Sequence, residues 1–118
     1  MENALVFLQK GEAGKAGEFL WGSVAEALQA VATSRGMHLA NHRSLRYFAG
    51  VIAKELGDAA LAQGFSDADR LHSNFYEVEL ELADVAAVLE PIRTTVAKLL
   101  ALIPPEALRE ESQEAPDL

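Results

Sequence analysis

The chain lacks cysteine altogether and contains little proline, and each shortage excludes a class of structure. None of its 118 residues carries a thiol, which excludes a disulfide framework and a thiolate metal site. Only four prolines occur, so few points of the chain resist a helical backbone. We therefore expect a protein built without cross-links or thiolate-bound metal.

Long apolar runs and targeting segments are also missing. The longest strongly apolar stretch, residues 96–103, is too short to cross a bilayer. The first twelve residues have no basic region, and their apolar run is shorter than a signal peptide requires. These absences predict a cytoplasmic protein that does not contact a membrane.

The residues that are present favour helix. Half of them are apolar, and alanine, leucine and glutamate are abundant. A chain of 118 residues has the size of one domain with one core. We expect a helical domain over residues 1–103, followed by an acidic and disordered tail over residues 104–118.

Charge is distributed unevenly along the chain. The net charge of −8 argues against non-specific binding of nucleic acid by the chain as a whole. Residues 27–54 nevertheless contain no acid, whereas the tail holds five acids and one arginine, a net charge of −4. The asymmetry suits a ligand with phosphate groups, or the pairing of one helix with another. The basic groups of the segment are Arg35, Arg43, Arg46, Lys54 and two histidines.

Apolar spacing predicts the first helices of an all-α, up-and-down antiparallel bundle of four to five helices. A short opening helix ends before Gly11, and a long one covers residues 12–34, with Trp21 at the edge of the core. Gly36 ends this helix, and Asn41 caps a second long helix over residues 42–56. The apolar face of that second helix is predicted to be Leu45, Phe48, Ile52 and Leu56.

The second half of the chain predicts two more helical regions. The third begins at Ala59 or at Ser66, and whether Gly64 divides it stays open. The last covers residues 84–103, with a kink at Pro91. The apolar face of the third region is predicted to be Leu71, Phe75, Val78 and Leu82.

The run ADRLHSNFYE, residues 68–77, places five kinds of polar group beside this apolar face. Helical spacing puts His72 and Tyr76 at one margin of the face. At the other margin lie Arg70, Asn74 and Glu77. As a site, His72 can move a proton, Arg70 can hold a phosphate and the remaining groups can position a ligand. Alternatively these groups satisfy one another, for example through a pair between Arg70 and Asp67.

Other candidate chemistry is limited. Arg43 and Arg46 share a helix face with Tyr47. This face can hold phosphate or RNA, with the Tyr47 ring stacking on a base, or it can be a solvated face without a ligand. His38 and His42 are four residues apart but lie at a predicted loop without a nearby carboxylate, so we expect no metal site. No phosphate-binding glycine loop occurs, and no cofactor is expected.

The run LHSNFYE (residues 71–77), together with GEFLWGSVAEALQAVA (residues 17–32), resembles the archaeal-type PaREP family within the broad group of HEPN domains. The likeness extends from residue 12 to residue 103. It implies an up-and-down helical bundle that is often a homodimer. Some HEPN proteins are metal-independent ribonucleases, and others are partners of small nucleotidyltransferases in toxin–antitoxin pairs.

The resemblance also bears on catalysis. HEPN nucleases carry an arginine and, four to six positions beyond it, a histidine, whereas Arg70 and His72 are only two apart. The leading hypothesis is therefore a homodimeric protein that binds a nucleotide, an RNA or a nucleotidyltransferase partner. The alternative is a toxin-type endoribonuclease in which His72 is the general acid or base and Arg70 stabilises the phosphorane. A third hypothesis is a structural dimer without a ligand.

Overall fold

The computed structural model describes residues 2–77 and 81–106, with the backbone alone for residues 2 and 73–77, and all regular structure in these residues is helical. The prediction of an all-α protein is confirmed, and the described residues contain no strand. The five helices are α1 (Glu2–Gln9), α2 (Ala13–Ser34), α3 (His42–Leu56), α4 (Ala59–Glu77) and α5 (Leu82–Leu100).

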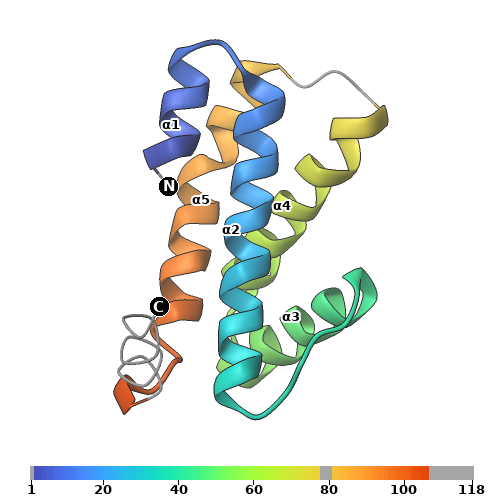
Figure 1. Ribbon diagram of the computed structural model, residues 1–118, viewed down its shortest axis with the longest axis vertical. Coiled ribbons are helices and arrows are strands. Elements are labelled where there is room, and N and C mark those ends of the chain that lie inside the picture. Colours follow the sequence, from blue (N-terminus) through green and yellow to red (C-terminus); the bar gives the residue numbers. More distant parts are fainter. Residues whose placement is uncertain (1, 78–80, 107–118) are drawn as a thin grey trace, which may run out of the picture.

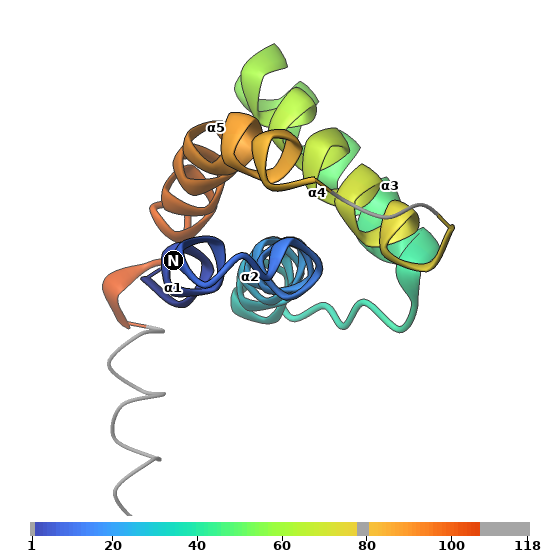
Figure 2. The same ribbon diagram turned by 90° about the horizontal axis from the view of Figure 1, so that it is seen from above.

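The helices form two layers around α2. Figure 1 shows α1, α2, α4 and α5 running alternately up and down, while α3 lies obliquely beside the lower part of α4. Seen from above, α1 and α2 form one layer, and α5, α4 and α3 form the other (Figure 2). The longest helix, α2, contacts each of the other four helices. It therefore supplies the largest share of the core, including fully buried Leu20, Val24, Leu28 and Val31.

Caps set the boundaries of α3 as the sequence predicts. The side chain of Asn41 accepts a hydrogen bond from the backbone N–H of Ser44 at 2.9 Å, which satisfies a donor of the first turn. At the other end Gly57 adopts a left-handed backbone with φ of 61°, a conformation that favours glycine. Gly36, also left-handed with φ of 75°, follows the end of α2.

The third helical region is one continuous helix, α4, that begins at Ala59 rather than Ser66. Asp58 caps it, because its Oδ1 accepts a hydrogen bond from the N–H of Leu61 at 3.1 Å. Its Oδ2 lies 2.8 Å from Nζ of Lys98 on α5. The hydrogen bond from Lys98 and those from backbone N–H groups lower the pKa of Asp58 below its ordinary value. The cap of α4 is thus also a link to α5.

Gly64 does not break α4 but lets it approach α5 closely. A Cβ atom at this position would lie 1.8 Å from Oγ1 of Thr95 and 2.9 Å from Cβ of Thr95. Thr95 is almost fully buried, and its hydroxyl donates a hydrogen bond to the carbonyl of Pro91 at 3.0 Å. Pro91 itself lies inside α5, which continues past it to Leu100. The missing side chain of Gly64 is therefore a requirement of α4–α5 packing.

Three details of the predicted helices were wrong. Leu82 begins α5 and is 42% exposed instead of closing the apolar face of the third helix. Leu56, expected in the core, is also 42% exposed, because it lies in the last turn of α3 beside the exposed Gly57. The last helix ends at Leu100, although Ile103 beyond it is still buried. Val78 and the predicted tail from residue 107 onward lie outside the described residues.

None of the helices in the described part of the chain is long and apolar enough to cross a membrane.

We predict that Gly64→Ala destabilises the protein by about 1–3 kcal/mol, because the new methyl group overpacks against Thr95. The matched control is Gly22→Ala in α2, where a Cβ meets nothing within 4 Å. That change should leave stability equal or raise it by up to about 1 kcal/mol, because alanine favours helix. Thermal unfolding followed by circular dichroism measures both, and equal melting temperatures for the two variants would contradict the close approach.

Candidate functional site

Three aromatic rings from three helices meet where α2, α3 and α4 come together. The ring of Trp21 stacks on the imidazole of His72 with centroids 4.9 Å apart, and it lies 5.0 Å from the imidazole of His42. The two imidazoles are themselves 5.7 Å apart and nearly parallel. We call Trp21, His42 and His72 the ring cluster. Phe65 of α4 borders it, 5.8 Å from the indole.

Each imidazole of the ring cluster has its own carboxylate. Nδ1 of His72 lies 3.0 Å from Oε1 of Glu18, and Nε2 of His42 lies 2.8 Å from Oδ1 of Asp69. The His42–Asp69 contact does not have hydrogen-bond alignment, so Oδ1 of Asp69, which is buried, lacks a hydrogen bond within the described residues. Arg46 approaches the other oxygen of Asp69 at 3.6 Å. The site therefore pairs two titratable rings with two acids.

Helical spacing brings the members of this site together from distant parts of the sequence. Glu18 and Trp21 are three residues apart on α2, and Asp69 and His72 are three residues apart on α4, so each pair shares one helix face. His42 is the first residue of α3. The imidazoles remain accessible, since the side chain of His42 is 36% exposed and that of His72 is 30% exposed. Trp21, by contrast, is buried.

The position of α3, and so of His42, depends on the loop over residues 36–41. Gln29 of α2 binds both backbone groups of Leu39, donating to its carbonyl and accepting from its N–H. The side chain of Leu39 is buried. Together these contacts hold the loop on α2 and place the beginning of α3 beside Trp21.

Arg70 is engaged elsewhere on α4. Its guanidinium donates to Oδ1 of Asp67 at 2.6 Å, and Gln63 donates to the same oxygen at 3.0 Å. Asp67 is buried, whereas the side chain of Arg70 is 62% exposed. The pair between Arg70 and Asp67 is thus the structural alternative that the sequence allowed. Because Arg70 and His72 are two residues apart, they do not share a helix face.

The remaining predicted ligand-binding residues of this run, Asn74, Tyr76 and Glu77, have side chains outside the described residues. Their backbone lies on the last turns of α4. Their roles therefore stay predictions.

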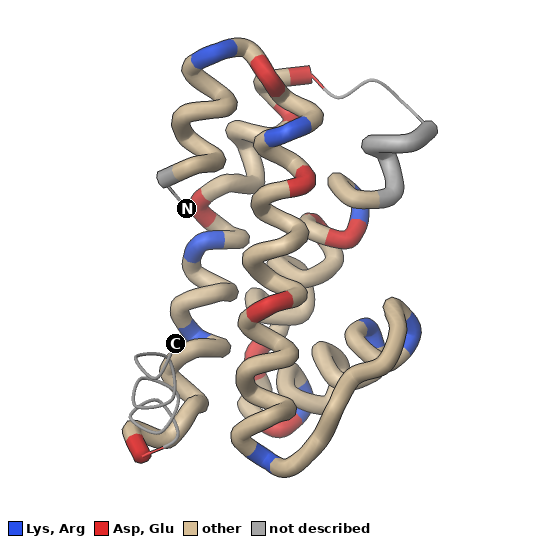
Figure 3. Tube along the Cα trace, in the orientation of Figure 1, with Lys and Arg blue, Asp and Glu red and all other residues tan. Residues whose placement is uncertain are grey.

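The outer face of α3 is basic and lacks neutralising acids. In Figure 3 the first turns of α3 show blue segments without red ones. Arg43 and Lys54 have no acidic partner in residues 2–77 and 81–106, and Arg46 has only the 3.6 Å contact with Asp69. We call Arg43, Arg46, Tyr47 and Lys54 the α3 face, and all four are exposed. In a chain with a net charge of −8, unpaired cations at one place need an explanation.

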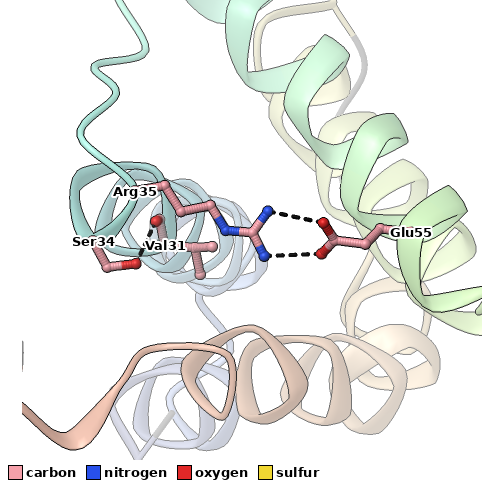
Figure 4. A network of polar contacts seen from close by, with 4 residues as sticks. All are labelled: Val31, Ser34, Arg35 and Glu55. Atoms are coloured by element: carbon pink, nitrogen blue, oxygen red, sulfur yellow. Dashed lines mark hydrogen bonds and ion pairs between the residues drawn. The ribbon is translucent and has the colours of Figure 1, made fainter.

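Arg35, in the same acid-free segment, is in contrast fully neutralised. Two nitrogens of its guanidinium bind the two carboxylate oxygens of Glu55 at 3.1 and 2.8 Å, which joins the end of α2 to the last turn of α3 (Figure 4). The hydrogen bonds from Arg35 lower the pKa of Glu55, and the same contact raises the pKa of Arg35. Arg35 therefore serves structure, while the other cations remain accessible.

Two hollows flank Tyr47, whose side chain is part of both walls. One, of about 400 Å³, is lined by apolar Met37, Leu39 and Phe48 and by Arg43. The other, of about 370 Å³, lies among residues 46–54 and includes Arg46 and Lys54. Tyr47 is 73% exposed, an unusual position for a ring without a ligand or partner.

The geometry limits what chemistry is available. Two imidazoles with carboxylate partners can accept and donate protons without a metal. The described residues contain no group of three or more histidine and acidic side chains that could hold a metal ion. The α3 face, with three cations and a ring, can bind phosphates and a base.

Sequence reasoning found His72 and the α3 face but missed the other members of the site. The sequence pattern gives no sign that His42 faces His72, which lies 30 residues farther along the chain on α4. Glu18 and Asp69 looked like ordinary helix-surface acids. The one usable signal was the three-residue spacing of each acid from an aromatic or imidazole ring on the same helix.

Comparison with known proteins identifies one family. The model of the archaeal PaREP1/PaREP8 family matches residues 1–96. No curated protein and no solved structure matches the chain.

Proposed function

The chain belongs to the archaeal PaREP1/PaREP8 family, and from this premise we propose that it is a binding protein for RNA or a nucleotide, with the α3 face as the binding surface. The observation that carries the proposal is a set of exposed cations on one helix, Arg43, Arg46 and Lys54, in a protein whose overall charge repels polyanions. Within the described residues Arg43 and Lys54 have no acidic partner, and Arg46 has only the 3.6 Å contact with Asp69. Local attraction of phosphate groups is the simplest reason to keep these cations exposed and largely unneutralised.

The ligand is anionic rather than merely apolar. The cations spread over twelve residues of helix, from Arg43 to Lys54, or about 16 Å along its axis, which is more than a single phosphate contacts. Tyr47 lies among them and offers a ring face for a base. These two features favour RNA over a free mononucleotide.

Membership of the wider HEPN group is also part of the proposal. The all-helical fold and the runs at residues 17–32 and 71–77 support it. That group implies a homodimer, and a nucleotidyltransferase partner of toxin–antitoxin type.

We expect the pure protein to have the mass of two chains by light scattering at micromolar concentration. Dilution should return a single chain only well below the concentration used for binding assays. A single-chain mass at every concentration would remove the dimer and leave RNA binding by the α3 face unaffected.

The first binding experiment measures the affinity for labelled single-stranded RNA at several salt concentrations. Replacing Arg43, Arg46 and Lys54 by glutamine should weaken binding and lower the slope of log Kd against log salt by about 0.7 for each lost phosphate contact, or about 2 in total. The control replaces Lys10, Lys15 and Arg93, which lie outside α3, and removes the same total charge. Equal effects of the two triple variants would show that only net charge matters, and would refute a binding site on α3.

A second candidate function, metal-independent endoribonuclease, is favoured by the ring cluster. In this reaction one neutral imidazole takes the proton of the ribose 2′-hydroxyl, whose oxygen attacks phosphorus. The other imidazole, protonated, gives its proton to the departing 5′-oxygen, so the products are a 2′,3′-cyclic phosphate and a 5′-hydroxyl end. We assign these two roles to His72 and His42, because each lies beside a carboxylate. Arg70, predicted to stabilise the phosphorane, is bound to Asp67 and does not share a helix face with His72, so this candidate reaction proceeds without it.

If the candidate is right, the protein cleaves mixed RNA in the presence of a chelator, and His72→Ala or His42→Ala lowers the rate by about 100-fold or more. His38→Ala changes the histidine outside the ring cluster but beside the larger hollow, so it should leave the cleavage rate at saturating RNA unchanged. Circular dichroism reports whether each variant remains folded. Cleavage that persists in both variants would come from a contaminant and would refute this activity.

A further inference from the structure

The two hollows beside Tyr47 are more specific than a basic surface, and we infer that they receive consecutive unpaired bases of single-stranded RNA, with the Tyr47 ring between them. This inference rests on the proposed function, which supplies RNA as the ligand, and adds which form of RNA the site accepts. The juxtaposition that carries it is one exposed ring shared by two hollows of similar volume.

The ring of Tyr47 is exposed rather than packed in the core. Its side chain is 73% exposed on a helix whose buried face is made by Phe48, Ala49, Ile52 and Ala53. The ring therefore does not serve the core. Tyr47 is among the residues that line both hollows, so its exposed side chain borders each of them. An aromatic ring that borders two hollows can stack on bases bound in them.

Both hollows have apolar and cationic residues in their linings. Met37, which is 46% exposed, contributes apolar surface to the larger hollow together with Leu39 and Phe48. Val51, 37% exposed, does the same in the smaller hollow. Each hollow thus combines apolar surface for a base with cations at its margin, Arg43 in one case and Arg46 with Lys54 in the other.

The spacing of the cations sets the direction of the strand. Arg43, Arg46 and Lys54 follow the axis of α3, and Tyr47 lies between the first and the last of them. A strand that follows α3 brings its phosphates to these cations and its bases to the two sides of Tyr47. A duplex does not fit this arrangement, because its bases are already stacked and paired and leave no face for the ring.

Binding of four labelled or competing ligands tests the inference: a short single-stranded RNA, its duplex, the DNA strand of the same sequence, and adenosine monophosphate. The single-stranded RNA should bind at least about ten-fold more tightly than the duplex, and the monophosphate should compete weakly. Tyr47→Leu should weaken binding of the single strand by about ten-fold, the loss expected when a stacked base loses its ring. It should leave duplex binding unchanged, and Tyr47→Phe, which keeps the ring, should bind like the original protein.

Each contrary result has a distinct meaning. If Tyr47→Leu binds the single strand as tightly as the original protein, while the glutamine triple variant of the α3 face does not, RNA binding stands and the role of Tyr47 is overturned. Duplex binding equal to that of the single strand, tighter binding of DNA, or equal competition by the monophosphate also overturns it. If the original protein binds none of the four ligands, the proposed function fails together with this inference. The exposed position of Tyr47 keeps the substitutions from unfolding the protein, and circular dichroism checks this.

Discussion

The packing of Trp21 against His42 and His72 is the contact on which the arrangement of the site depends. It is the point where α2, α3 and α4 meet, and it joins residues that are far apart in the sequence. Because α3 makes fewer packing contacts than the other long helices, its orientation relies on this contact, on the loop bound by Gln29 and on the ion pair between Arg35 and Glu55. With α3 held in this way, its buried face covers α4 and its basic face is left to solvent.

Arg46 connects the residues proposed for RNA binding with those proposed for catalysis. Arg46 belongs to the α3 face and also approaches Asp69, the acid beside His42. A strand bound along α3 therefore passes close to the first turn of that helix, where the accessible imidazoles lie. The proposed RNA binding and the proposed proton transfer are compatible in this geometry, and the proposed binding does not require proton transfer. The charges agree with this division, since Arg35, Arg70 and Lys98 each have a carboxylate partner and serve the fold.

Much of the fold could be predicted because its determinants are local. The cap at Asn41, the left-handed Gly36 and Gly57, and the apolar spacing of α2 act within a turn or two of helix. Where prediction was wrong or left a question open, the cause was tertiary. Gly64 looked like a possible break but is required by a threonine on α5, and Leu82 and Leu56 fit an apolar pattern that the packing leaves half exposed. For the site, the residue types of His72 and of the α3 face were visible in the sequence.

By itself the sequence determined the all-helical class, the ends of α3, the unequal distribution of charge and the kinds of polar group available. Only the tertiary structure decided that His42 faces His72, and that Asp69 and Glu18 are their respective partners. The reason is physical: a helix forms through contacts three or four residues apart, which the sequence displays directly. The meeting of three helices depends on how side chains interlock across the core, and no local pattern contains that information.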